Sequence, residues 1–410
     1  MKKRILFVDD EHSVIMGLQR MLHSMRNEWE MYFAGSGVEA LAVLSNTPVD
    51  IVVSDMRMPG MDGAQLLGKV MELYPGVVRI ILSGFSDEQM VLRSVKTAHQ
   101  FIPKPSDVNI LKQTIERTCM LRERLSDENL LKVVTGIKDL PSLPALHQSL
   151  IKEMESADPS LKKIAEIVSQ DISMTARVLQ LVNSAFFGLG SKVTHPRQAV
   201  ALLGINTLKA LVLNIRFFSA FNPRPYANFS VEHLWKHSLM VGNLARQIVQ
   251  LESPDHKLEE RAMIAGILHD IGMLPLLEIP GYYERLNAVC SDQKCSRIEA
   301  EYKLMGTSHA EVGSYLLGLW GLPDLILEPV LFHHCPAKLK DNTFSVLTAV
   351  HVANALLQPD YDPAYIREIG RLDINYLSSI NLLRRLDDWQ GLFNQMIERD
   401  LHAEKSTTGR

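Results

Sequence analysis

Over its first hundred residues the chain alternates short apolar runs with longer segments whose apolar residues recur every three or four positions. Short continuous apolar runs are typical of strands buried on both faces of a parallel sheet, and the segments between them are typical of amphipathic helices. The apolar runs are at 5–8, 51–53, 80–82 and 101–102, and the expected helices are at about 12–26, 37–46, 64–74, 87–96 and from 107 onward. The alternation predicts a doubly wound parallel sheet over residues 4–105.

Helical periodicity continues past this sheet, from 107 to about 135. Positions at spacings of three and four fall on one face of the segment, at Leu111, Ile115, Thr118, Leu121 and Leu125. The segment is longer than the sheet needs for cover. We interpret it as a rod that joins two domains and pairs two chains into a homodimer. The alternative is that its first half simply covers the sheet.

A proline-rich break at 140–144 ends this helix and begins a second domain. From 145 to about 395 the periodicity is helical nearly everywhere, which predicts an all-α domain. The last residues are polar, and we expect them to be frayed. The chain is therefore divided into a first domain over 1–122, a helical linker over 123–136, an all-α domain over 137–395 and a polar tail over 396–410.

Composition limits the classes of function. The chain has 410 residues, of which 46% are apolar and 22% are charged, which is ordinary for a globular protein of two or three domains. The net charge of −4 gives no reason to expect wholesale binding to nucleic acid or to a membrane surface. The four cysteines form no C-x-x-C pair, which fits reduced thiols in a cytosol.

No segment is typical of a targeting signal or a membrane span. The basic start is followed by only four apolar residues before Asp9, which is too few for the core of a signal peptide. The longest apolar stretch, 199–208, is interrupted by Asn206 and followed by Lys209. We therefore expect a cytoplasmic protein without a membrane span.

Polar residues close the apolar runs of the first domain. Each run is closed by one of them or by a pair: Asp9-Asp10, Asp55, Ser83 and Lys104. Taken alone, an Asp-Asp pair after a strand is more often a helix cap. Together the residues are expected to converge, because ligands of such sheets bind beyond the carboxyl ends of the strands. Clustered carboxylates need a counter-charge, and Mg²⁺ prefers oxygen ligands, so the pattern predicts a site for Mg²⁺ and a phosphoryl group.

Residues 1–122 resemble the receiver domain of two-component response regulators. The resemblance is carried by the Asp-Asp pair, the Asp55 strand end, the Met-Pro-Gly-Met-Asp-Gly loop at 58–63, Ser83 and the ending Phe101-x-x-Lys104-Pro105. It implies a flavodoxin-like α/β fold with a five-stranded parallel sheet. It also implies that a histidine kinase transfers a phosphoryl group to Asp55.

The same resemblance implies a set of Mg²⁺ ligands. Asp10, Asp55 and the backbone carbonyl of Arg57 would bind the ion directly. Asp9 would help through a water molecule. Lys104 would pair with the phosphoryl oxygens.

A conformational switch is also implied. Phosphorylation adds nearly two negative charges. Ser83 would move toward them and bond a phosphoryl oxygen, and Phe101, at the family's switch position, would fill the space that Ser83 leaves. The face around the fourth helix, the fifth strand and the fifth helix would then act on the second domain. The family often has a cis peptide at the place of Lys104-Pro105.

Histidines recur through the second half of the chain. They stand at His237, His269-Asp270, His309, His333-His334 and His351. An adjacent His-Asp pair on a helix, with further histidines, is a pattern that binds one or two metals and activates water for hydrolysis. The alternative is a buried, hydrogen-bonded cluster that fixes helix packing.

Residues from about 137 to 345 resemble an HDOD domain, a relative of the HD phosphohydrolases. The segments that carry the resemblance are 170–171, 181–186, 202–204, 234–238, 266–272, 309–313, 320–323 and 333–334. The resemblance implies an all-α output domain. It places a degenerate HD site at His237, His269, Asp270, His309, His333, His334 and Asn354.

Departures from the active HD enzymes argue against turnover. Asn354 stands where a final Asp ligand is expected, and a neutral amide is a poor ligand for Mg²⁺ or Mn²⁺. Enzymes that hydrolyse cyclic-di-GMP carry Lys where this chain has Met273, and their Gly-Tyr-Pro motif is replaced by Cys-Pro-Ala-Lys at 335–338. We therefore expect an output domain that is not an enzyme. Whether a metal binds there stays open.

These patterns together indicate a response regulator. A receiver phosphorylated on Asp55 would switch an HDOD domain that binds a downstream signalling protein. DNA contact is not expected, because no helix-turn-helix with a basic recognition helix is present. One alternative is a metal-dependent HD-type phosphohydrolase gated by Asp55. Another is a phosphate sink, in which nothing changes beyond residue 122.

Overall fold

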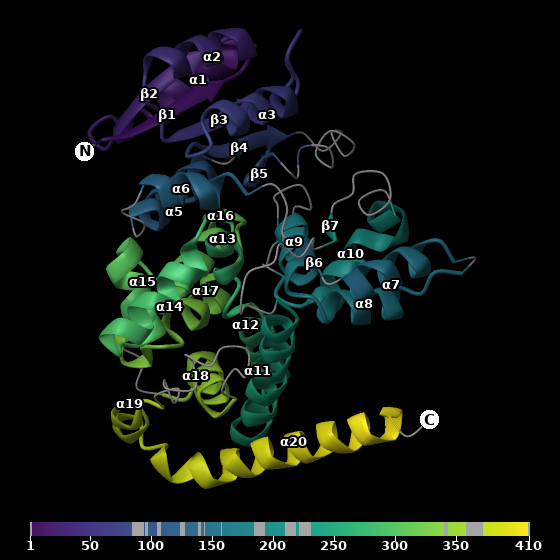
Figure 1. Ribbon diagram of the computed structural model, residues 1–410. Helices are drawn as coiled ribbons and strands as arrows, with labels where there is room; N and C mark the ends of the chain where they lie inside the picture. The colour runs from purple at the N-terminus through teal and green to yellow at the C-terminus, as the bar shows by residue number, and fades with distance from the viewer. Residues whose placement is uncertain are drawn as a thin grey trace. The chain divides into compact units, whose positions relative to one another are not determined.

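The computed structural model describes most of the chain (Figure 1). The described residues are 2–83, 94, 97–104, 108–123, 128–137, 141–142, 144–156, 158–183, 193–209, 219–220, 231–339, 343–357 and 372–408. The chain divides into two compact units. Unit 1 comprises Met1–Ser169, Ser173–Phe221 and Tyr315–Leu322, and unit 2 comprises Gln170–Ile172, Asn222–Ser314 and Pro323–Arg410.

Unit 1 begins with a five-stranded parallel sheet, as predicted. The strands are β1 (Lys3–Val8), β2 (Trp29–Ala34), β3 (Ile51–Asp55), β4 (Val78–Ser83) and β5 (Gln100–Pro103). Their order across the sheet is β2-β1-β3-β4-β5. Four strands coincide with the predicted apolar runs. β2 is absent from those runs because only Trp29 and Ala34 of its residues are buried.

Helices lie between and after these strands, and two of them begin at capping side chains. They are α1 (His12–Met21), the short 3-10 helix η1 (His23–Met25), α2 (Gly37–Asn46), α3 (Gly63–Leu73) and α5 (Val108–Glu123). The Ser36 side chain accepts from the Glu39 amide at the start of α2. Asp62 and Gln65 form a reciprocal capping box at the start of α3. The predicted helix at 87–96 falls on residues of which only 94 is described.

The segment that was expected to form one rod is described as two helices, α5 and α6 (Glu128–Thr135), and 124–127 between them lie outside the described residues. α6 packs back against the sheet. The buried Arg79 guanidinium at the start of β4 donates to the Thr135 carbonyl at 2.8 Å, and His99 contacts the same carbonyl at 2.9 Å. The described end of the linker is thus held at the sheet by polar contacts that the helical pattern does not reveal.

The rest of unit 1 is mostly helical. It holds α7 (Pro144–Met154), α8 (Leu161–Ser169), α9 (Ile172–Asn183) from Ser173 onward, and α10 (Pro196–Lys209). A two-residue parallel pairing joins β6 (Pro141–Ser142) to β7 (Ser219–Ala220). Strands this short have no periodicity, so the sequence pattern does not indicate them.

Unit 2 is helical in its described residues, as predicted. Its elements are α11 (Val231–Glu252), α12 (His256–Leu268), α13 (Met273–Leu277), α14 (Tyr282–Gln293), α15 (Arg297–Met305), α16 (His309–Leu319) up to Ser314, α17 (Asp324–Phe332), η4 (Pro336–Lys338), α18 (Val346–Leu356), α19 (Ile374–Ser379), η6 (Leu383–Arg385) and α20 (Leu386–Thr408). α11 and α12 touch at glycines: a Cβ on Gly266 would lie 2.6 Å from the Gly242 Cα. Their backbones therefore pack in direct contact.

The polar tail differs from its predicted frayed state. α20 runs to Thr408 and so includes most of 396–410. Its start is anchored by the fully buried Trp389, whose Nε1 donates to Glu252 Oε1 at 2.9 Å, and Arg385 Nε donates to the same oxygen at 2.8 Å. These anchors precede the tail and are not visible from its composition.

Within the described residues no single helix is long and apolar enough to cross a membrane. A pair of helical segments broken by a 107° bend, His256–Leu277 and Tyr282–Gln293, meets the same criteria of length and composition.

Candidate functional sites

Two acidic side chains and one lysine meet at the carboxyl end of the sheet. Asp9 follows β1, Asp55 ends β3 and Lys104 follows β5. Lys104 Nζ lies 2.8 Å from Asp9 Oδ2 and 2.5 Å from Asp55 Oδ1. Asp9 is 1% exposed and Asp55 7% exposed. The structure thus brings together three residues that the strand ends singled out.

The backbone around Asp55 is held by the start of α3. A Cβ on Gly63 would lie 2.2 Å from the Asp55 carbonyl oxygen, so only glycine fits there. The Gly63 amide donates to the Met56 carbonyl at 2.9 Å. The Arg57 amide donates to Asp55 Oδ2 at 3.0 Å. This loop fixes the direction in which the carboxylate points.

The negative charges of Asp9 and Asp55 exceed the positive charge of Lys104. Burial raises the pKa of Asp55, Asp9 raises it further, and Lys104 opposes both. Burial by itself lowers the pKa of Lys104, but hydrogen bonds to Asp55 and Asp9 outweigh burial and raise that pKa. Two carboxylates therefore share one ammonium group. A hard divalent cation corrects such an imbalance, and the all-oxygen donor set fits Mg²⁺.

The other predicted receiver residues lie on β4, on β5 and in the segments that follow β1 and β3. Ser83 is buried, and its Oγ has no hydrogen-bond partner among the described residues. The Ser83 carbonyl accepts from the Lys104 amide at 2.8 Å. Phe101 is buried on β5, opposite Ile81 of β4. Asp10 and the Arg57 side chain are exposed. Pro105 lies outside the described residues.

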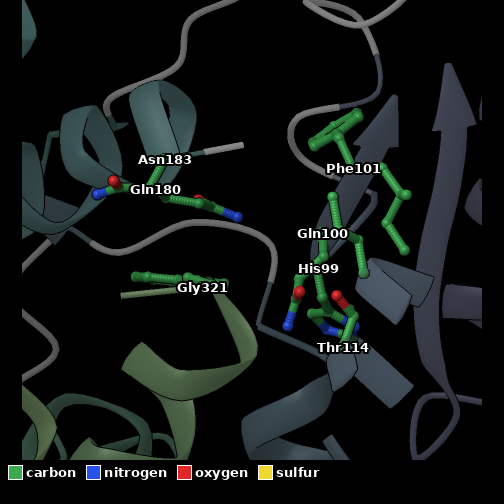
Figure 2. Close-up of a pocket in the computed structure, with 10 residues that line it drawn as sticks. His99, Gln100, Phe101, Thr114, Gln180, Asn183 and Gly321 are labelled. Carbon is green, nitrogen blue, oxygen red and sulfur yellow. The ribbon is translucent and has the colours of Figure 1, made fainter. Parts of the chain in front are cut away.

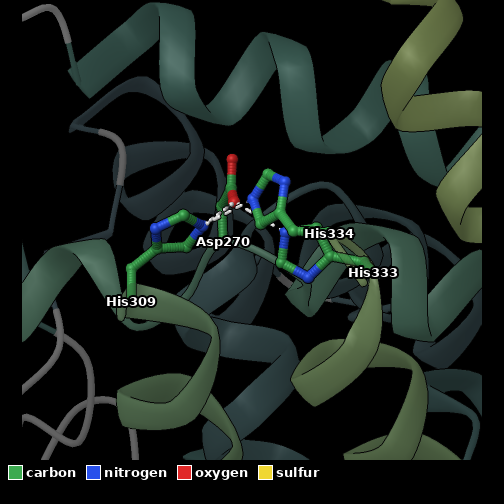
Figure 3. Close-up of side chains that lie close together, drawn as sticks. All are labelled: Asp270, His309, His333 and His334. Carbon is green, nitrogen blue, oxygen red and sulfur yellow. Dashed lines mark hydrogen bonds and ion pairs between the residues drawn. The ribbon is translucent and has the colours of Figure 1, made fainter. Parts of the chain in front are cut away.

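Imidazoles surround a single carboxylate in unit 2 (Figure 3). Asp270 Oδ2 is 3.2 Å from His269 Nε2, and Asp270 Oδ1 is 3.2 Å from His309 Nε2 and 3.6 Å from His333 Nε2. His334 Nε2 lies 3.1 Å from His309 Nε2. Because α12 ends at Leu268 and α16 begins at His309, these side chains come from helix ends that meet.

Carbonyl groups orient two of these rings. His269 Nδ1 lies 2.7 Å from the Gly266 carbonyl, and His333 Nδ1 lies 2.7 Å from the Val330 carbonyl. A carbonyl only accepts, so Nδ1 carries the proton in the neutral ring and Nε2 points a lone pair toward Asp270. These Nε2 atoms and both Asp270 oxygens are buried without a hydrogen-bond partner among the described residues. Nitrogen lone pairs that face carboxylate oxygens are a suitable environment for a bound cation, because all of these atoms can donate electron pairs to it.

Glu301 contacts the Nδ1 side of His309, and no pattern in the sequence indicates it. The fully buried Glu301 Oε2 accepts from the His309 amide and lies 2.8 Å from His309 Nδ1. Tyr282 and Arg297 donate to Glu301 Oε1 at 3.1 and 3.3 Å. A lone Glu in a helical segment gives no sequence signal, because most such residues face solvent.

Protonation in the cluster follows its charges. Burial lowers the pKa of His309, but Glu301 and Asp270 outweigh burial and raise that pKa to about 9. Burial lowers the pKa values of His237 and His333 to about 4. Burial raises the pKa of Asp270, yet the neighbouring imidazoles outweigh it and hold that pKa well below its usual range. The ionised Asp270 carboxylate and the neutral imidazoles of His237 and His333 are metal-binding donors, whereas His309 has to lose its proton before it can bind a metal.

The ligand atoms form two groups that share Asp270. One group is Asp270, His309, His333 and His334, and the other is His237, His269 and Asp270. Within each group the ligand atoms lie within 4.8 Å of one another. The residues present therefore fit one or two transition-metal ions with nitrogen and oxygen ligands.

Asn354 and His351 do not belong to either group of potential metal ligands. Asn354 Oδ1 lies 3.0 Å from His237 Nε2. His351 Nδ1 lies 2.7 Å from the His333 carbonyl, and its Nε2 accepts from the Asp373 amide at 2.9 Å. Both His351 nitrogens are used in packing contacts, so His351 is a structural histidine.

Two protein-family models match the chain. The response regulator receiver domain matches residues 5–116, and the HDOD domain matches residues 140–336. The first range holds the Asp9, Asp55 and Lys104 site, and the second holds all the histidines of the Asp270 cluster.

Individual relatives match more weakly. An uncharacterized protein of Treponema pallidum (strain Nichols) is 22% identical over 69% of this chain and 53% of its own length. The hydrogenase transcriptional regulatory protein HoxA of Cupriavidus necator is 31% identical over 37% of this chain and 31% of its own length. The chain thus spans about half of the first relative and about a third of the second. The solved MmoQ response regulator from Methylococcus capsulatus is 20% identical, covers 59% of this chain and 98% of its own, and has a TM-score of 0.45.

Proposed function

We propose that this chain, a response regulator whose receiver domain precedes an HDOD output domain, accepts a phosphoryl group from a histidine kinase on Asp55 and signals to a partner protein. The observation that carries the proposal is the position of Lys104 Nζ between the buried carboxylates of Asp9 and Asp55. The ammonium balances charge that grows when a phosphoryl group arrives.

The transfer chemistry follows from this geometry. A carboxylate oxygen of Asp55 forms a bond to phosphorus while the bond from phosphorus to the donor breaks. Lys104 pairs with the phosphoryl oxygens. Asp10, Asp55 and the carbonyl of Arg57 would hold Mg²⁺, which would supply further positive charge when bound. The Arg57 amide keeps the second Asp55 oxygen oriented during the transfer.

A switch follows the transfer. The buried Ser83 hydroxyl has no hydrogen-bond partner among the described residues, so it gains one by moving toward a phosphoryl oxygen. Phe101, on the neighbouring strand β5, then takes the space that Ser83 leaves. The two arrangements form a two-state equilibrium that phosphorylation shifts.

The output is proposed to be binding of a downstream signalling protein. The amide of Asn354 replaces a charged ligand and faces His237, which weakens the site as a hydrolytic centre. Binding is therefore favoured over catalysis as the output of the HDOD domain.

A second candidate function is favoured by the lone pairs that face Asp270. In this alternative the cluster holds metal, and the HDOD domain is a phosphohydrolase gated by Asp55. Bound metal would polarise a phosphoester and activate water. The chain's own part is to hold Nε2 of His269 and His333 toward Asp270 by the carbonyls of Gly266 and Val330.

Phosphorylation is tested by incubating the protein with acetyl phosphate and Mg²⁺ and separating the products on a phosphate-affinity gel. The wild type and a control with the exposed carboxylate Glu72→Gln are expected to shift, and Asp55→Asn is not. A shift that persists in Asp55→Asn contradicts the assignment of the acceptor.

Metal content tests a requirement of the second candidate. If the hydrolase holds, elemental analysis of purified protein is expected to find metal, and His333→Gln then loses it while the exposed His256→Gln keeps it. If no stoichiometric metal is found after reconstitution with Mn²⁺, Fe²⁺ or Zn²⁺, the hydrolase is excluded.

A further inference from the structure

Side chains that bind transition metals gather at Asp270 in unit 2, and the enclosed cavity in unit 1 has no comparable donor set (Figure 2). That cavity has a volume of about 70 Å³, and neither a carboxylate nor a cysteine is among the described residues that line it. Around Asp270, five histidines form two groups that share its carboxylate: the His309 group (Asp270, His309, His333 and His334) and the His237 group (Asp270, His237 and His269). The two groups differ in how their nitrogens are held, and this difference favours one of them as a metal site.

Glu301 holds the ring of His309 with one nitrogen toward Asp270. The fully buried Glu301 carboxylate accepts from the His309 amide at 2.8 Å and lies 2.8 Å from His309 Nδ1. An ionised carboxylate only accepts hydrogen bonds, so Nδ1 carries a proton and Nε2 is left facing Asp270 Oδ1 at 3.2 Å. A negative partner on the far nitrogen makes the near nitrogen a stronger electron-pair donor to a metal.

The other two histidines of the His309 group also suit a metal site. His333 Nδ1 lies 2.7 Å from the Val330 carbonyl, which leaves its buried Nε2 facing Asp270 Oδ1 at 3.6 Å. His334 is only half-buried, whereas the other members of the group are buried, so its side is the more accessible to an entering ion. The group offers three imidazoles and one carboxylate, which is the number of protein donors in a closed zinc site.

The His237 group is weaker in its contacts and in its access. His237 Nε2 lies 3.0 Å from Asn354 Oδ1 and 3.9 Å from Asp270 Oδ2. An amide oxygen only accepts, so His237 Nε2 donates to it and has to give up that hydrogen bond before it can bind a metal. The second ring, His269, is oriented by the neutral carbonyl of Gly266 and not by a carboxylate. All three members of this group are buried.

We infer that the cluster takes one transition-metal ion, in the His309 group, and that Glu301 is the positioning residue for His309 as a ligand. The inference rests on the metal binding that the second candidate function requires. When the ion binds, the Nε2 proton of His309 leaves to solvent, and the Nδ1 proton stays in the hydrogen bond to Glu301. The His237 group remains without an ion, since a second cation would be repelled by the first and would share the same carboxylate.

Zinc titration of the metal-free full-length protein, in competition with a coloured chelator, tests which group binds. The wild type is expected to bind one Zn²⁺. His333→Gln and His269→Gln are a matched pair, because each ring is buried and is oriented by a backbone carbonyl. His333→Gln is expected to lower the affinity at least about a hundredfold, and His269→Gln to change it less than about threefold. An equal loss in the two variants, or the reverse order, overturns the inference.

Glu301→Gln tests the positioning role. It removes the charge on the Nδ1 side of His309 and is expected to weaken zinc binding about ten- to a hundredfold. Tyr282→Phe is the matched control, because it removes a hydrogen bond to Glu301 Oε1 at 3.1 Å and leaves the carboxylate in place. The control is expected to bind zinc within about threefold of the wild type. Wild-type affinity in Glu301→Gln, or an equal loss in Tyr282→Phe, overturns the role of Glu301.

Nitrogen NMR of the wild type with isotope-labelled histidines needs no substitution, so it decides even where a variant does not fold. One equivalent of Zn²⁺ is expected to shift the ring signals of three of the 14 histidines. One of these rings is expected to carry an Nδ1 proton that is strongly deshielded by a carboxylate, and its absence overturns the role of Glu301.

The number of shifted rings also separates the inference from the function on which it rests. Two shifted rings would place the ion in the His237 group, and five would mean two ions. Either result overturns the inference and leaves the second candidate function standing. A wild type that binds no zinc overturns both and leaves the proposed phosphorylation of Asp55 standing.

Discussion

Lys104 contacts two buried carboxylates that repel each other, and the Asp270 carboxylate is contacted by imidazoles that are themselves oriented by acceptors. At the first place two buried carboxylates share one ammonium group, and at the second one buried carboxylate is faced by several imidazoles. Such arrangements are common at functional sites, because a buried charge without compensation is unfavourable for folding. The sites are therefore best tested by changing one charge at a time.

Lys104→Met removes the ammonium between Asp9 and Asp55. Without Mg²⁺ we expect the variant to lose about 1–3 kcal/mol of stability, because two buried carboxylates are left without their partner. Mg²⁺ is expected to raise the melting temperature more in the variant than in the wild type. Thermal melts with Mg²⁺ or with a chelator measure this difference. Equal Mg²⁺ effects in the two proteins contradict the proposed charge balance.

Asp50→Asn tests a charge away from either site. Burial raises the pKa of Asp50, but hydrogen bonds from Arg4 and the charge of Arg122 outweigh burial and lower it below 3.8. A lowered pKa gives stability that is present above the ordinary pKa and is lost as the pH falls through the folded value. The variant is expected to be less stable by about 1–2 kcal/mol near neutral pH. Denaturation measured as the pH falls should show this difference shrinking below about pH 4.

The positions of the site residues at strand ends could be predicted from the sequence. The residues that support a site residue from another helix could not. Asp9, Asp55 and Lys104 follow separate apolar runs, and parallel topology requires their side chains to meet. Glu301 contacts His309 from a different helix, eight residues away, and its burial depends on packing that no local pattern encodes. His351 belongs to the recurring histidines but not to the expected HD site, and its nitrogens are used in packing contacts.

In both the receiver and the HDOD domain, glycines allow secondary-structure elements to pack closely. Gly63 brings α3 against the end of β3, and Gly272 brings the turn after α12 against the start of α16. Any side chain at these positions would displace a residue of a candidate site, Asp55 in one case and His309 in the other. Close approach of backbone therefore positions both sites.

Gly63→Ala is expected to disturb the phosphoryl site. The added methyl would lie 2.2 Å from the Asp55 carbonyl oxygen, so β3 or α3 has to shift. We expect a loss of about 1–3 kcal/mol and a slower reaction with acetyl phosphate. Gly17→Ala is the control: nothing lies within 4 Å, and the variant is expected to gain up to about 1 kcal/mol of helix stability. Phosphorylation at the wild-type rate in Gly63→Ala would contradict the role of this contact.

Gly272→Ala is the matching test in unit 2. Its methyl would lie 2.0 Å from the His309 carbonyl oxygen, so the start of α16 has to move away from Asp270. The expected loss is about 1–3 kcal/mol, measured by chemical denaturation. Gly391→Ala on α20 has open space and should be neutral or stabilising. A Gly272→Ala variant as stable as Gly391→Ala would mean that the helix start adapts without cost.

Helix and strand types were predicted better than their connections. Apolar runs and capping residues such as Ser36 and Asp62 act locally, so the sequence indicates them. The return of α6 to the sheet depends on the contact of Arg79 with Thr135, between residues distant in the chain. The helical tail of α20 likewise depends on the anchor of Trp389 on Glu252.

At the scale of the whole molecule, the receiver match and the HDOD match do not coincide with the two compact units. Parts of the HDOD match, including α9 and the 315–322 segment, cluster with the receiver in unit 1. Residues of both family matches therefore lie inside a single unit, and a signal from phosphorylated Asp55 would meet HDOD residues there. This organisation favours a direct effect of phosphorylation on the output domain over a phosphate sink.

Hydrogen exchange of the full-length protein, with and without beryllofluoride and Mg²⁺, tests this central claim most directly. Asp55→Asn runs beside the wild type as the control. We predict that wild-type exchange changes in α5 and α9 and in further peptides between 140 and 336, and that Asp55→Asn shows no change. Changes confined to residues 1–122, or equal changes in Asp55→Asn, would contradict a switch that passes from Asp55 to the HDOD domain.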